Sequence, residues 1–75
     1  MSSEQLQIDL SEAMDVDQRS WLVAKLEDER GIISAWFDDE NHHRLIVHYE
    51  REHFSHTTLL DTIKEHGFHG KIVGD

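Results

Sequence analysis

The sequence contains no cysteine and no proline. Without cysteine the chain can form no disulfide, and it can offer no thiolate to a metal ion. No apolar run approaches the length of a membrane-spanning helix, and the first residues lack the basic and apolar regions of a signal peptide. We therefore expect no membrane insertion and a cytoplasmic location.

Basic residues are also scarce. Seven lysines and arginines stand against sixteen aspartates and glutamates, which gives a formal net charge of -9 with neutral histidines. Nucleic acids and anionic membrane surfaces are bound by clustered lysine and arginine, so this charge argues against both partners. A cation or a basic protein surface is the more natural partner, although a high net charge also keeps small proteins in solution without any partner.

The pattern along the chain predicts alternating strands and helices. The length of 75 residues suits one small domain, and no linker-like stretch divides it, so we expect a single domain over residues 1–75. Two runs rich in β-branched and aromatic residues flank an uninterrupted polar segment, which predicts a central β-hairpin. The predicted elements are a strand at Gln5–Leu10, a helix at Gln18–Arg30, strands at Ile32–Phe37 and Arg44–Glu50, a helix at Thr57–His66 and a strand at Phe68–Val73.

Two groups of apolar residues and glycines resemble the heavy-metal-associated domain family, which includes small copper chaperones and the N-terminal modules of metal-transporting ATPases. Leu22, Leu26 and Gly31 fall where the family's first helix carries two apolar residues and then a glycine. A second match is the stretch 59–68, Leu-Leu-x-x-Ile-x-x-x-Gly-Phe, which resembles the family's second helix and the glycine–aromatic pair after it. The resemblance covers residues 6–73. It implies an α+β, ferredoxin-like βαββαβ sandwich, with a four-stranded antiparallel sheet and two helices on one face.

The sequence departs from this family at the metal site. The family binds metal through Met-x-Cys-x-x-Cys at the end of the first strand. Counted back from Gly31, the two cysteine positions hold Asp15 and Gln18, and the methionine position holds Ala13. Copper(I) bound by thiolates is therefore excluded. A metal-binding or metal-transport role requires other ligands.

The implied fold offers such ligands because three of its loops share one end. Seven histidines are present in the chain, and several of them fall in these loops beside aspartates. Imidazole and carboxylate groups suit zinc, nickel, cobalt, manganese or iron(II) better than copper(I). Imidazole must be neutral to bind, so such a site would release its metal on acidification. The predicted ligands are Asp15, Asp17, His42, His43, His66 and His69.

Each of these residue types also has an ordinary structural role. Asp15 begins an Asp-x-x-Gln sequence, which is the spacing of a helix capping box and needs no metal. His42 and His43 stand at the tip of a polar loop, where exposed histidines are common without any ligand role. His66 ends a predicted helix, where a cation interacts favourably with the helix dipole.

The open face of the implied sheet suggests an alternative function. A tryptophan beside an isoleucine in mid-sheet is suited to protein contacts, although scattered apolar residues are ordinary on protein surfaces. The alternative is a protein-interaction or regulatory module that kept the fold and lost metal binding. Its partner would be a metal transporter or a second copy, docked on this face or on the edge strand Ile32–Phe37. The predicted partner face carries Trp36, Ile46 and His48, with Gln5, Gln7 and Asp9 beside them.

Catalysis is the function class that the sequence favours least. No serine lies in a recognisable nucleophile motif. Acylphosphatases share this kind of fold, but they need a cationic phosphate-binding loop after the first strand. Here that loop holds Glu12, Asp15 and Asp17, which would repel phosphate. We therefore expect a binding domain and not an enzyme.

Overall fold

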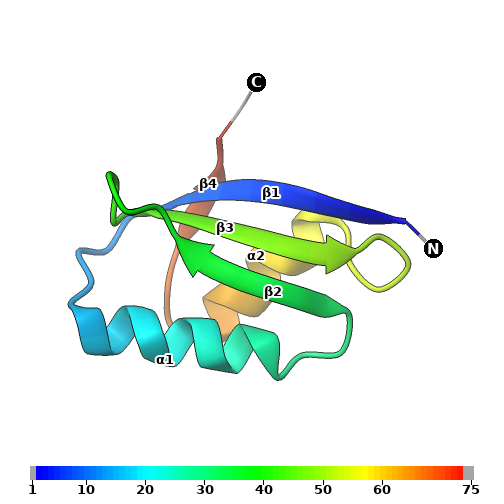
Figure 1. The fold of residues 1–75 in the computed structure, drawn as a ribbon, viewed down its shortest axis with the longest axis horizontal. Helices are drawn as coiled ribbons and strands as arrows, with labels where there is room; N and C mark the ends of the chain where they lie inside the picture. The colour runs from blue at the N-terminus through cyan, green and yellow to red at the C-terminus, as the bar shows by residue number, and fades with distance from the viewer. Residues whose placement is uncertain (1, 74–75) are drawn as a thin grey trace.

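The computed structural model describes residues 2–73, which form one antiparallel sheet and two helices (Figure 1). The strand order is β2-β3-β1-β4, which is that of the expected ferredoxin-like βαββαβ fold. Neither helix in this described range is long and apolar enough to cross a membrane. In chain order the elements are β1 (Ser3–Leu10), α1 (Val16–Glu27), β2 (Ile32–Phe37), β3 (Arg44–Glu50), α2 (His56–Glu65) and β4 (Gly70–Ile72).

The core lies between one face of the sheet and the two helices. Side chains alternate along β1 and β3, so every second residue from Leu6 to Leu10 and from Leu45 to Tyr49 is buried on the helix side. In β2 a register shift between Ile32 and Ser34 interrupts the alternation, and the buried residues are Ile32 and Ala35. The register of β1 against β3 sets Leu6 opposite Val47 and Ile8 opposite Leu45. The buried residues are Leu6, Ile8, Leu10, Leu22, Leu26, Ile32, Ala35, Leu45, Val47, Tyr49, Leu59 and Ile63.

Strands β2 and β3 have the predicted bounds, whereas the first predicted helix was wrong at both ends. It begins two residues earlier than predicted, because Asp15 is its N-cap and accepts a hydrogen bond from the backbone N–H of Gln18 at 2.8 Å. The helix ends at Glu27, with Asp28 as its C-cap. Gly31 therefore does not stop the helix directly but lies in the turn that leads into β2.

The second predicted helix is displaced by one residue, and the last predicted strand is shortened at both ends. Helix α2 begins at His56, because Ser55 caps it in a capping box with Thr58. It ends at Glu65, and Gly67 follows the C-cap His66 with a φ of 95°, as a helix stop requires. The last strand is confined to β4, which is shorter than predicted.

Two glycines adopt the left-handed backbone conformation, but only one of them is also closely packed. Gly31 has a φ of 100° and Gly67 a φ of 95°. A Cβ atom on Gly31 would clash with the Cβ of His53, whereas no atom lies within 4 Å of a Cβ placed on Gly67. Gly31 is thus required both by its backbone angle and by the approach of the loop between β3 and α2.

We expect Gly67→Ala to lower the free energy of unfolding by about 1–2 kcal/mol, the cost of the left-handed conformation for a residue with a Cβ. Gly31→Ala should cost roughly a further 1–3 kcal/mol, because the new methyl group overpacks against His53. Urea unfolding of both variants measures the difference. In a His53→Gly background the cost of Gly31→Ala should fall towards that of Gly67→Ala, and an unchanged cost would contradict the packing argument.

Candidate functional site

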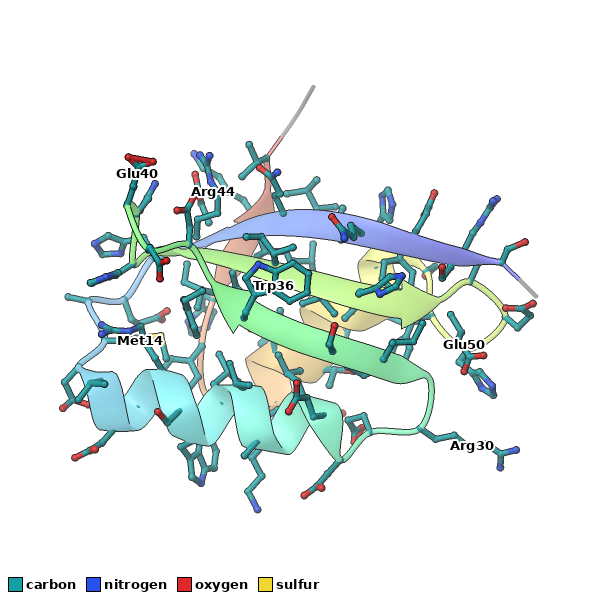
Figure 2. The ribbon with its side chains drawn as sticks, in the orientation of Figure 1. Met14, Arg30, Trp36, Glu40, Arg44 and Glu50 are labelled. Carbon is teal, nitrogen blue, oxygen red and sulfur yellow. The ribbon has the colours of Figure 1, made fainter. Side chains whose placement is uncertain are left out.

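Three loops meet at one end of the sheet, as the fold requires. The backbone N–H of Leu10 donates to the carbonyl oxygen of His43 at 2.8 Å, and the N–H of Ser11 donates to that of His69 at 2.8 Å. The end of β1 is therefore bonded to the β2–β3 loop, and the loop that follows β1 is bonded to the α2–β4 loop. In Figure 2 this three-loop end carries the labelled Met14 and Glu40, whereas Arg30 marks the opposite end.

Among the described residues, a short contact between two side chains at the three-loop end joins Glu12 and His69. One carboxylate oxygen of Glu12 accepts the backbone N–H of His69 at 2.9 Å, and the other lies 2.7 Å from the ring Nδ1. These hydrogen bonds lower the pKa of the Glu12 carboxyl below its ordinary value. The side chain of His69 is 62% exposed, and with Nδ1 turned to the carboxylate its Nε2 is the ring nitrogen left for another contact.

Two of the predicted ligands are engaged in structural contacts. Asp15 closes the predicted capping box: its carboxylate accepts the Gln18 N–H, and the Gln18 side chain accepts the Asp15 N–H at 3.0 Å. His66 is half-buried, and its ring meets Trp21 edge-on with 5.7 Å between the ring centroids. Its Nε2 is buried and has no hydrogen-bond partner among residues 2–73.

The other predicted ligands are exposed. Asp17 lies in the first turn of α1, where its negative charge suits the helix dipole. His42 and His43 lie in the β2–β3 loop, whose turn is held by the side chain of Asn41, the acceptor for the His43 N–H at 3.1 Å. Across the described part of the chain, no three histidine, aspartate or glutamate side chains are grouped so that they could hold a metal ion. The six-residue ligand set therefore stays a prediction.

Sequence reasoning missed the Glu12–His69 pair. It recognised Glu12 only as an acidic residue that would repel phosphate. The two residues are 57 positions apart, and no spacing rule connects them. The available signal was topological: Glu12 follows β1 and His69 precedes β4, and these strands are neighbours in the sheet.

The open face of the sheet has the composition that the alternation predicted. Trp36 is 39% exposed, and in Figure 2 its ring lies over the face of the sheet that is turned away from α2. Trp36 stands opposite Ile46 in the register of β2 and β3. His48 and Ile46 are half-buried on this face. Nothing in this arrangement tests a partner for the three residues, and that role stays a prediction.

We expect the Glu12 carboxylate to stabilise the fold in a pH-dependent way. Its pKa in the folded protein is lower than the ordinary 4.5, so its contribution is complete above the unfolded pKa and is lost as the pH falls through the folded pKa. Glu12→Gln should therefore flatten the decline of the urea midpoint between about pH 6 and pH 3. Glu65→Gln, which removes an exposed acid on α2, is the matched control. Equal slopes in the two variants would argue against the Glu12–His69 contact.

Comparisons with known proteins find the fold but no close sequence. No family model matches the chain, and no curated protein matches it. Oxidized MerP from Ralstonia metallidurans CH34 is similar with a TM-score of 0.82 and 8% identity, covering 97% of this chain and 100% of that one. A copper binding domain from HMA7, a P-type ATPase, gives a TM-score of 0.81 at 16% identity, over 93% of each chain.

A metallochaperone called CopZ gives a TM-score of 0.71 at 22% identity, over 96% of this chain and 100% of that one. At identities this low, structural similarity establishes the fold alone. The similarity extends over nearly the whole length of these structures. The expected resemblance is thus confirmed at the level of structure: this is a cysteine-free chain with the fold of the heavy-metal-associated domains.

Proposed function

We propose that the chain is a small metal-associated domain that takes up a divalent transition-metal ion at the three-loop end through imidazole and carboxylate groups. The Glu12–His69 pair is the observation that carries this proposal. Histidines that ligate metals commonly donate the N–H of their other ring nitrogen to a carboxylate. This hydrogen bond fixes the orientation of the ring and raises the basicity of the ligating nitrogen. Here the carboxylate lies 2.7 Å from Nδ1, so Nε2 of His69 is the proposed ligand.

The remaining ligands must be recruited when the ion binds, because residues 2–73 hold no ready group of three. His42 and His43 are exposed, so they can turn towards an ion without leaving a packed position. Asp17 is exposed as well. Asp15 would have to leave its helix cap and His66 its contact with Trp21, so we expect these two to contribute less.

The nature of the ion follows from the available ligands. Several structural neighbours are described as copper binding domains or metallochaperones. This chain has no thiolate to bind copper(I), and its nitrogen and oxygen donors suit zinc, nickel, cobalt, manganese or iron(II). We propose a binding role without catalysis, in the cytoplasm, with a metal transporter as the natural partner.

A second candidate is a protein-interaction module that has kept this fold without the metal. The capping box at Asp15 favours it, because the position that carries a ligating cysteine in the resembling family serves here to start a helix. The exposed Trp36 supplies a surface on which such a module could act.

An amide NMR titration of the metal-free protein with zinc, nickel, cobalt and manganese tests the first proposal. We expect saturable shifts or paramagnetic broadening at residues 11–17, 42–43 and 67–70, reversed when the pH is lowered because the imidazoles become protonated. His69→Ala should abolish these saturable shifts. Glu12→Gln should weaken binding by about 10–100-fold, as the loss of a partner that orients a ligand does.

His56→Ala is the control, since His56 begins α2, outside the three loops, and should leave the affinity unchanged. Shifts that persist in His69→Ala would rule out His69 as a ligand. If no ion causes shifts at micromolar concentration, protein interaction would remain as the proposed function.

A further inference from the structure

An apolar groove runs between α1 and β2, at the edge of the sheet. It has a volume of about 390 Å³. Val16 on α1 is 63% exposed and Trp36 on β2 is 39% exposed, so large apolar surfaces border it on both sides. In Figure 1 helix α1 lies alongside β2, the end strand of the sheet. The apolar residues that line the groove are Val16, Val23, Ala24, Ala35, Trp36 and Phe37.

The edge of β2 beside this groove has backbone groups that no strand pairs with in the described sheet. The N–H of Ala35 points outward, because it donates to the carboxylate of Glu27 on α1 at 3.2 Å. Alternation along a strand turns the N–H of Phe37 to the same side. A carboxylate over an edge protects it from unwanted pairing, but a peptide carbonyl can replace this long hydrogen bond.

The charges around the groove select the kind of chain that could pair there. Asp38, Asp39 and Glu40 follow β2 and, with Trp36 and Phe37, line a second hollow of about 680 Å³. Glu27 adds a carboxylate on the α1 side.

Among residues 2–73, Arg19 is the one basic side chain that lines the first groove, and its guanidinium donates to the carbonyl oxygen of Met14 at 2.7 Å. The surface is therefore an apolar floor with a mainly acidic rim.

We propose that the β2 edge and this groove dock an extended, basic segment of a partner protein as a fifth strand. Main-chain hydrogen bonds to Ala35 and Phe37 would fix the register of the added strand. Its alternate apolar side chains would fill the groove, and its lysines or arginines would contact the acidic rim. A second copy of this chain is the poorer occupant, since each copy carries a net charge of -9 and the same acidic rim. The proposal sharpens the interaction role and does not depend on a metal ion.

The test uses chelator-treated full chain and a nine-residue peptide of alternating valine and lysine, blocked at both ends. We expect saturable amide shifts on β2 and on the facing side of α1, with an affinity that falls as salt is added. The same peptide with glutamate in place of lysine should not bind. N-methylation of the peptide amides on one edge should abolish binding, and methylation on the other edge should not, because an added strand uses one edge only.

Trp36→Ala should weaken binding by about tenfold or more, as the loss of a central aromatic contact does. The matched control is Ile33→Ala, because Ile33 is 50% exposed on the same strand but does not line the groove. Binding of the acidic peptide with equal affinity, shifts confined to the Gln5 and Gln7 side of the sheet, or no binding at millimolar peptide would each overturn the proposal. A dimer in sedimentation that Trp36→Ala abolishes would assign the edge to a second copy instead. A failed metal titration would leave this result unaffected.

Discussion

The pairing of β1 with β3 is the contact on which the remaining structure depends. Side chains alternate between the two faces of a sheet, so a slip of one residue would turn Leu6 and Ile8 from the core to solvent. The observed register sets Leu6 against Val47 and keeps both buried. It also brings the end of β1 to the β2–β3 loop, where the N–H of Leu10 meets the carbonyl of His43. The core and the three-loop end are thus consequences of the same register.

The first turn of α1 shows what replaces the cysteine at the three-loop end of this fold. The N–H groups at the start of a helix need acceptors, and Asp15 supplies one to Gln18. A carboxylate in this position serves the helix, whereas a thiolate there in the resembling family serves a metal. Glu12 and His69, which are outside the helix, form the side-chain pair at the three-loop end on which the proposed metal site rests. Under the proposed metal role, nitrogen and oxygen donors in place of sulfur would favour a different ion.

The acidic charge of the chain links its two proposed surfaces. At the three-loop end it favours a cation, and along β2 it favours a basic chain over a second acidic copy. The carboxylate of Glu27 over the N–H of Ala35 has a further effect, because it leaves the sheet edge polar and less prone to pair without selection. The groove along β2 borders the core at Ala35, so changes at that residue would also affect the packing of the sheet.

The sequence by itself determined the element order, the core face and the bounds of β2 and β3, because period-two alternation and β-branched residues are local signals. It also identified Asp15 as a capping residue, although it did not place the start of the first helix there. What only the tertiary structure decided are the contacts between distant segments. Glu12 meets His69, Trp21 covers His66, and Glu27 reaches Ala35 across the groove. Such contacts depend on how far apart the folded elements hold their side chains, and no repeat along the chain encodes that distance.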